Sequence, residues 1–505
     1  MTVAARRALH PDDAWAAGLA LVLVVVPIVL GTIVGSTMLS WLVPIVTTAI
    51  AVAAFVVRPT RAIVVIALFV LFIDTVAIGA GPRVKAVDEM LVPILGLITV
   101  IRQRERIPSL WSWPREIGVA LVLAAAVASS LVNAVPLLVW VPGLLLIAKA
   151  FGFFYIAILL DIDRDDVAWA MRVVLAVGVV VLALGVVQLV VPSAFEVFGV
   201  RAQTERAGLP AIKSIFYHAQ LFGWFCGVIA LYLFAGHALY RRPWMLILGL
   251  VFSVGTVLSA RRRAMLGIAG GLLAGLSVAV AAARGRRPAE LLRWLPSAVG
   301  IVVIAVAFLP ALTGLARLAV RDYVEPLPTA SGDPGLPDPL PAEPEEVAGT
   351  PARIALYQTS LLIARDHAPF GAGLGRFGSW MSRTEYSPVY AEYGLDDVYG
   401  LSPQNPSFIT DTFWPQVLGE AGGIGVIGYV IFLAAVGLQI VLAYRRRDPT
   451  DPLVTLAILG AGMILAQTLI ESVASPIFNS PTQIYLVMLA IGGMLGWQAR
   501  RPDAG

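Results

Sequence analysis

Long apolar runs recur along this chain from residue 14 to residue 499, separated by short polar segments. A helix needs about 20 consecutive apolar residues to cross the hydrocarbon core of a membrane. The runs predict about 14 spans, over roughly 14–35, 38–57, 62–80, 88–101, 116–134, 136–160, 168–192, 215–236, 244–260, 264–283, 295–313, 417–444, 452–472 and 482–499. The run at 88–101 is short and predicts a tilted or re-entrant segment.

The composition agrees with this pattern. Of the 505 residues, 59% are hydrophobic and only 13% are charged, whereas soluble domains are about 25% charged. A soluble enzyme with a membrane anchor would show one or two apolar runs, so that class is excluded. The first run, from Trp15 to about Ile33, is too long for a signal sequence and is followed by further spans. It predicts an uncleaved first transmembrane helix.

The basic residues orient the chain. If the N-terminus is cytoplasmic and the side alternates at each span, nearly every basic cluster falls on the cytoplasmic side, as the positive-inside rule requires. These clusters are Arg6, Arg7, Arg58, Arg61, Arg102, Arg104, Arg106, Arg241, Arg242, Arg284, Arg286, Arg287, Arg293, Arg445, Arg446, Arg447, Arg500 and Arg501. We therefore expect a multi-pass protein of the cytoplasmic (inner) membrane with both termini cytoplasmic.

Three basic groups fall on the outer side instead and oppose this bias. The first is the turn that holds Arg261, Arg262 and Arg263; the others are Arg201, Arg206 and Lys213, and the pair Arg83 and Lys85. Contact with lipid headgroups is one explanation. The other, favoured for the three-arginine turn, is an anionic substrate at the outer surface.

The same alternation places a loop of roughly 100 residues, 314–416, on the outer face. It separates an N-terminal bundle of about 11 spans (1–313) from C-terminal transmembrane helices (417–505). Its proline- and acid-rich part, 324–350, predicts an extended linker. Residues 351–367 predict an interfacial helix. Arg353 would lie in the first turn of that helix, against the macrodipole, which suggests a phosphate or a nearby acid as its partner.

Several side chains are candidates for chemistry. Asp411 and Glu420 flank the predicted outer end of the 417–444 span and are the best-placed carboxylates for a general base. Lys149 is intramembrane and should have a partner, with Asp74 the other intramembrane charge. His218 and Arg376 are further candidates. The glycines of FGAGLGRF, Gly371, Gly373 and Gly375, predict a tight turn rather than a nucleotide loop, because no strand precedes them.

The candidates suggest one arrangement. Arg206, Arg261 to Arg263 and Arg353 can converge at the outer surface, where guanidinium groups bind a pyrophosphate in bidentate fashion. A nearby carboxylate would deprotonate a sugar hydroxyl. No metal is expected, because the only cysteine, Cys226, and the four histidines show no ligand spacing.

Segments of the chain resemble the O-antigen ligase and O-antigen polymerase family of bacterial membrane glycosyltransferases. The segments are IFYHAQLFGWF, VLSARRRAMLGI, RIALYQTSLLIARDHAPFGAGLGRF and TDTFWPQVLGEAGGIGVIG, within roughly 206–435. The resemblance implies an all-α polytopic membrane protein that transfers or polymerises an undecaprenyl-pyrophosphate-linked glycan in surface polysaccharide biosynthesis. It implies no cofactor. The position of the family's His-Asn pair is occupied here by Asp411 and Thr412, which is a departure from the family pattern.

The expected partners are a lipid-linked oligosaccharide donor, a glycan or lipid acceptor and membrane lipids, with no nucleic acid. Two other functions remain open from the sequence. One is a transporter or lipid flippase, in which Lys149 and Asp74 would be pathway charges. The other is a non-catalytic assembly scaffold, which the Asp411 departure keeps open.

Overall fold

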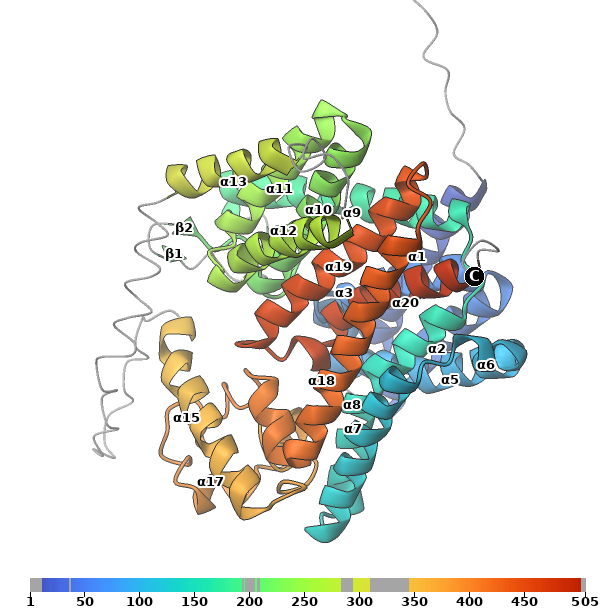
Figure 1. The fold of residues 1–505 in the computed structure, drawn as a ribbon. Helices are drawn as coiled ribbons and strands as arrows, with labels where there is room; N and C mark the ends of the chain where they lie inside the picture. Colours follow the sequence, from blue (N-terminus) through green and yellow to red (C-terminus); the bar gives the residue numbers. More distant parts are fainter. Residues whose placement is uncertain are drawn as a thin grey trace, which may run out of the picture.

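The computed structural model describes residues 11–35, 38–192, 195, 205–206, 209–282, 294–308 and 345–500. These residues form a helical protein (Figure 1). Apart from its helices, the described chain contains only one very short antiparallel pairing, between β1 (Glu205–Arg206) and β2 (Leu209–Pro210).

Nine helices in the described part of the chain are long and apolar enough to cross a membrane. They are α1 (Pro11–Val34), α2 (Leu42–Val57), α7 (Trp113–Val132), α8 (Leu137–Leu159), α9 (Arg164–Val190), α10 (Ala219–Tyr240), α12 (Arg262–Ala282), α18 (Trp414–Arg446) and α19 (Pro452–Ser472). The prediction of a multi-pass helical membrane protein is confirmed at this level, whereas the predicted number of about 14 spans is not shown.

The remaining apolar segments explain the difference in number. The predicted span 62–80 is broken into α3 (Pro59–Leu71) and α4 (Ile73–Ala80), which are bent by 67° and could together make a tenth span. The helices α11 (Pro243–Leu258) and α13 (Leu295–Ala307) are shorter than a typical span. Two further predicted spans correspond to α5 (Ala86–Gln103) and α20 (Pro481–Ala499). Short connecting helices complete this part: η1 (Met38–Trp41), η2 (Pro82–Lys85), η3 (Arg104–Arg106), α6 (Ile107–Leu110) and η6 (Ile477–Asn479).

Helix α10 is the central helix of the bundle. In its most apolar stretch of 18 residues, 89% of the residues are buried inside the protein. The helix packs against α9, α11, α12 and α19. Small residues permit such close packing, as is usual between helices in a membrane. A Cβ at Gly223 would lie 2.3 Å from Oγ of Ser259, so the start of α10 and the end of α11 touch at a glycine.

Both ends of the described chain lie at the start of α9. The indole Nε1 of Trp169 donates a hydrogen bond to Asp13 (3.0 Å), and Arg500 donates one to the carbonyl of Ile162 (3.2 Å). Arg61 forms an ion pair with Asp166 (3.4 Å) in the same region. We call this the basic end of the bundle, because several of the predicted cytoplasmic arginines gather there.

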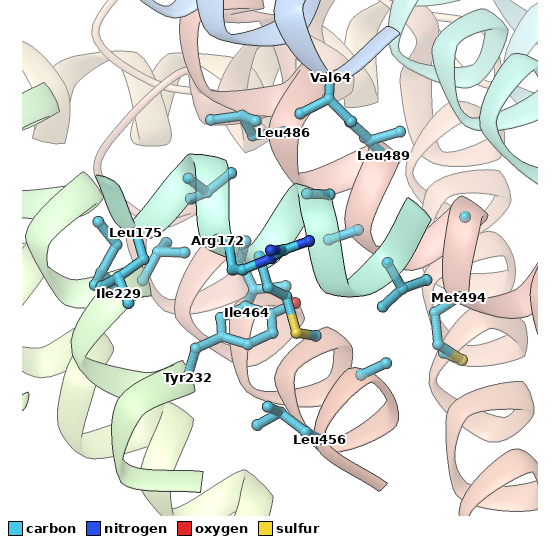
Figure 2. Close-up of a pocket in the computed structure, with 18 of the residues that line it drawn as sticks. Val64, Arg172, Leu175, Ile229, Tyr232, Leu456, Ile464, Leu486, Leu489 and Met494 are labelled. Atoms are coloured by element: carbon cyan, nitrogen blue, oxygen red, sulfur yellow. The ribbon is translucent and has the colours of Figure 1, made fainter. Parts of the chain in front are cut away.

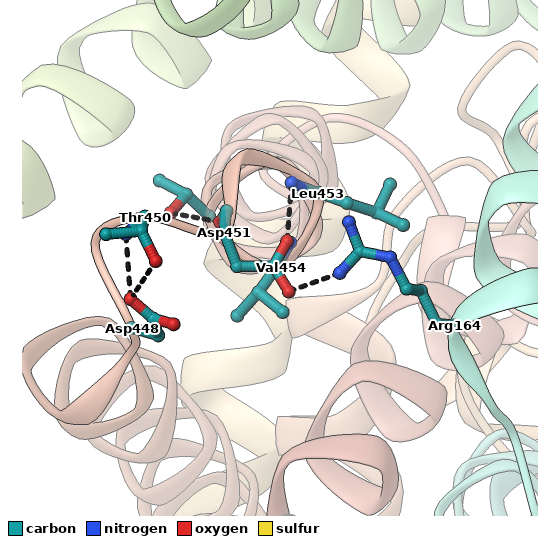
Figure 3. Close-up of polar contacts among 7 residues, drawn as sticks. Arg164, Asp448, Thr450, Asp451, Leu453 and Val454 are labelled. Carbon is teal, nitrogen blue, oxygen red and sulfur yellow. Dashed lines mark hydrogen bonds and ion pairs between the residues drawn. The ribbon is translucent and has the colours of Figure 1, made fainter.

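The connection between α18 and α19 belongs to the basic end and is held by side-chain caps. Asp451 accepts hydrogen bonds from the amides of Leu453 (3.1 Å) and Val454 (3.3 Å), and so caps α19. Its second carboxylate oxygen pairs with Arg164, the first residue of α9 (Figure 3). These contacts tie α9 to α19 at one end of the bundle.

The described part of the 314–416 region is a compact unit with a hydrophobic core of its own. It contains α15 (Glu345–Asp366), α16 (Trp380–Thr384) and α17 (Val389–Glu392), and α15 packs on α18 (Figure 1). The core includes Leu356, Ile363, Phe377, Tyr390 and Ile409. The helix begins at Glu345, before the predicted start at residue 351. Residues 324–344 of the predicted linker lie outside the described residues.

Candidate functional site

The three-arginine turn lies between α11 and α12, at the end of the bundle opposite the basic end. The amide of Ala260 bonds to the carbonyl of Val257 (2.9 Å), and Ala260 is buried with φ of 53°. Few residues other than glycine adopt this backbone. After this sharp turn, Arg261 directly precedes α12 and Arg262 and Arg263 are its first two residues; all three are half-buried.

Arg263 is bound only by a neutral side chain. Its Nη2 donates to Oε1 of Gln220 (2.9 Å), and Gln220 in turn donates to Ser475 (2.7 Å). Its Nε is buried and has no hydrogen-bond acceptor among the described residues. No carboxylate lies within ion-pair distance of Arg263 in this part of the chain. A half-buried cation with an unsatisfied donor is unfavourable unless an anion binds it.

Arg353 extends from α15 toward the same end. Its Nη2 lies 2.5 Å from Oδ2 of Asp411, and its Nε is buried without an acceptor. The predicted conflict with the helix dipole is wrong, because α15 begins at Glu345 and Arg353 lies beyond the first turn. The acid that pairs with Arg353 is Asp411, which precedes α18, rather than an acid of its own helix.

Glu471 completes this group, and the sequence reasoning missed it. It lies at the end of α19 and is fully buried; its Oε1 accepts from Gln467 (3.2 Å), and its Oε2 has no partner among the described residues. The signal was present, since Glu471 is an acidic residue inside the predicted span 452–472, and such residues are usually functional or paired.

These side chains form one electrostatic cluster. Arg263 interacts with the charges of Arg353, Arg261, Asp411 and Glu471. We call these five residues the arginine site. They come from α12, α15, α19 and the segment before α18, so the tertiary fold brings together segments that are far apart in sequence.

Other predicted site residues are Arg206, His218 and Arg376. The backbone of Arg206 is in β1, but its side chain is outside the described residues. His218 precedes α10, is exposed and makes an edge contact with Tyr217 (ring centroids 4.6 Å apart). Arg376 is half-buried in the glycine turn. Of the predicted residues, the structure brings Arg261, Arg263, Arg353 and Asp411 together.

Glu420 has a structural role in the described chain. Its carboxylate accepts hydrogen bonds from the amide of Phe377 (3.2 Å) and from Nε2 of Gln416 (3.3 Å), and it contacts no arginine there. It is fully buried. These contacts hold the glycine turn against α18, whereas the catalytic role of Glu420 stays a prediction.

The glycine turn that contains Gly371, Gly373 and Gly375 packs between α7 and α18. All three glycines have positive φ. Oγ of Ser129 and Nδ2 of Asn133, at the end of α7, donate to the carbonyl of Gly371 (3.1 and 2.8 Å). These contacts account for the glycines as a packing element that fixes α15 relative to the bundle.

Lys149 forms a buried ion pair with Asp88 of α5. Its Nζ lies 2.8 Å from Oδ2 of Asp88, and the two side chains are 7% and 6% exposed. Asp74 instead pairs with Lys85 (2.6 Å). The two intramembrane charges of the transporter hypothesis thus have separate local partners, which accounts for both without a transport pathway.

The buried pair predicts a stability effect. We expect Lys149→Met to lower the free energy of unfolding by about 3–5 kcal/mol, because it leaves the Asp88 carboxylate buried without its partner. The double variant Asp88→Leu/Lys149→Met should recover most of this loss. Thermal unfolding in detergent measures both. A single variant as stable as the wild type would contradict the proposed role of the pair.

Among the described residues, no group of three or more His, Cys, Asp or Glu side chains is placed to hold a metal ion. The polar groups at the arginine site are guanidinium and amide donors with two carboxylates. Such donors bind an oxyanion rather than a cation.

Comparison with known proteins gives no family: no protein-family model matches the sequence, and no curated protein matches it either.

Proposed function

We propose that this protein transfers or polymerises an undecaprenyl-pyrophosphate-linked glycan at the outer face of the bacterial cytoplasmic membrane, as the O-antigen ligase and polymerase family does. The observation that carries the proposal is the arginine site. Arg263 and Arg353 each present a buried Nε without an acceptor in the described chain. A pyrophosphate offers several acceptor oxygens and negative charge to guanidinium groups at one position.

The proposed reaction is a displacement at the anomeric carbon of the donor. The hydroxyl oxygen of the acceptor forms a bond to that carbon, and the bond from the carbon to the pyrophosphate oxygen breaks. The pyrophosphate leaves with the electron pair on its lipid. Arg263 and Arg353 stabilise the charge that develops on the leaving group, which is the largest contribution that a preorganised site can make.

The two carboxylates of the site are proposed to have different roles. Asp411 is 27% exposed beside Arg353, so an acceptor hydroxyl can reach it and transfer its proton. Glu471 is fully buried and electrostatically coupled to Arg263. We therefore assign Asp411 as the general base. Glu471 is assigned as a positioning residue whose negative charge partly neutralises Arg263.

The proposed topology has both termini in the cytoplasm. Because both ends of the described chain lie at the basic end, the number of membrane crossings between them must be even. Because nine is an odd number, the nine long apolar helices cannot be the complete set of spans in this topology. We propose that the bent pair α3–α4, α5, α11, α13 and α20 also cross, which restores the predicted number of about 14.

The roles of the carboxylates are tested by Asp411→Asn and Glu471→Gln in cells that carry only the variant copy. We expect Asp411→Asn to lower glycan synthesis by about 10²–10⁴-fold, the usual contribution of a general base. Glu471→Gln should lower it less and weaken donor binding. The measurement is the chain-length profile of the surface polysaccharide.

A matched control distinguishes an effect at the arginine site from a general effect of losing a carboxylate in the folded unit that contains α15. Asp396 belongs to the same folded unit and is not part of the arginine site, so Asp396→Asn should leave the profile unchanged. An unchanged profile in a normally inserted Asp411→Asn protein would remove Asp411 as the base. Flux of labelled lipid-linked sugar into liposomes without polymer growth would contradict the enzymatic proposal and support a transporter.

A further inference from the structure

An apolar cavity with a basic residue in its wall opens near the basic end of the bundle. A cavity of about 400 Å³ lies between α3, α9, α10, α11, α19 and α20, within the size range of ligand pockets. Its walls are almost entirely apolar; Figure 2 shows, among others, Leu175, Ile229, Leu456, Leu486 and Met494 around it. A cavity with such walls is expected to exclude water.

The cavity begins at the basic end and extends into the bundle. Thr60, Asp166 and Trp244 line its outer part, beside the basic-end residue Arg61. Ile464 and Leu175 line its deeper part. On α9, the lining from residue 166 to residue 175 corresponds to roughly 14 Å at 1.5 Å per residue, about half of the hydrocarbon thickness.

One cation, the exposed Arg172, lies at the edge of this apolar space. Arg172 lies two turns from the start of α9, and Figure 2 shows its guanidinium among the lining side chains. Its only hydrogen bond in the described chain is from Nε to the carbonyl of Ala168 (3.3 Å), which lies one turn closer to the basic end. The side chain is therefore directed toward the membrane surface, as basic residues near helix ends are.

The acid nearest in sequence does not neutralise Arg172. Asp166 lines the same cavity, but its carboxylate pairs with Arg61 (3.4 Å) and caps the start of α9 through the amide of Asp163 (3.4 Å). No ion-pair partner of Arg172 exists among the described residues. The described chain therefore leaves the charge of Arg172 available to an anion from outside the protein.

We propose that this cavity binds one anionic phospholipid from the leaflet at the basic end, with an acyl chain in the apolar part and the phosphate on Arg172. A single amphiphile meets both requirements, since its chain fills the dry space and its phosphate neutralises the cation. The site is distinct from the arginine site, because none of the residues that line the cavity belongs to that cluster. It does not depend on the proposed glycosyl transfer.

The test is native mass spectrometry of the full chain, delipidated and then equilibrated with mixed micelles of phosphatidylglycerol and phosphatidylcholine. The wild type should retain one phosphatidylglycerol. Arg172→Gln should lower this retention about fivefold, as expected for one basic residue near a membrane surface. Ala170→Phe, which places a ring in the cavity, should abolish it. Arg164→Gln is the matched control on the same helix and should retain the lipid.

A second measurement on the wild-type fold decides the matter if a variant does not fold. Trp244 lines the cavity, so the fluorescence difference between the wild type and Trp244→Phe reports on it. In nanodiscs, lipids brominated on the acyl chain should quench this difference more strongly as phosphatidylglycerol than as phosphatidylcholine. Equal quenching by the two lipids, or equal retention of both by the wild type, would overturn the proposal.

Discussion

Replacement of Arg263 by glutamine is expected to lower glycan synthesis by about 10²–10³-fold, the usual effect of removing one preorganised donor from a developing anion. The same variant should unfold at the same temperature as the wild type or at a higher one. Activity is thus expected to fall while stability does not, because Arg263 has a neutral hydrogen-bond partner and an unsatisfied buried Nε. Removal of this side chain breaks no ion pair in the described chain and relieves the cost of the unsatisfied Nε, which offsets the lost attraction to Glu471.

Inorganic pyrophosphate provides a second readout for this prediction. A ligand that binds the folded state raises its stability according to concentration and affinity. Pyrophosphate should therefore raise the unfolding temperature of the wild type and leave that of Arg263→Gln nearly unchanged. Arg383→Gln is the matched control, because Arg383 is an exposed arginine of the same loop unit. An Arg263→Gln protein with normal polysaccharide and a normal pyrophosphate response would exclude Arg263 from the site.

The second large effect concerns the kink of α18. Gly422 has φ of 66° and ψ of −169° inside that helix, a conformation available essentially only to glycine. A Cβ there would lie 2.3 Å from the carbonyl oxygen of Pro369. Gly422→Ala should therefore lower the free energy of unfolding by about 3 kcal/mol or more, because backbone strain and a steric clash act together.

The neighbouring glycine is the control for this prediction. A Cβ on Gly423 meets no atom within 4 Å, and its backbone is helical. Gly423→Ala should thus be neutral or stabilise the protein by about 0.5–1 kcal/mol. Thermal unfolding of the two variants in the same detergent measures the difference. Similar stabilities for Gly422→Ala and Gly423→Ala would show that the contact between the glycine turn and α18 is absent.

The residue-level predictions from the sequence differed in quality for a physical reason. The sequence alone predicts a functional turn at Arg261 to Arg263, because positive charge on the outer side opposes the insertion bias. Glu420 was assigned chemistry because of its position near a predicted helix end. Its role in binding the glycine turn depends on a contact across 43 residues, to the amide of Phe377, which periodicity does not encode.

The start of α15 and the partner of Lys149 illustrate the same limit. The helix begins at Glu345, although the sequence pattern predicts a start at residue 351. Helix boundaries are the least certain part of any pattern, because packing overrides local preference. The free-energy cost of a charged lysine inside the membrane is enough to predict that Lys149 has a partner. The identity of that partner, Asp88, depends on how α5 packs on α8.

The sequence by itself determined that this chain is a multi-pass helical membrane protein, because the length and apolarity of its runs leave lipid as the only suitable solvent. It also identified which basic residues depart from the general bias. Only the tertiary structure decided which charges meet: Arg263, Arg353, Asp411 and Glu471 come from four distant segments. Electrostatic interaction depends on distance in space, and helix packing rather than sequence spacing sets that distance.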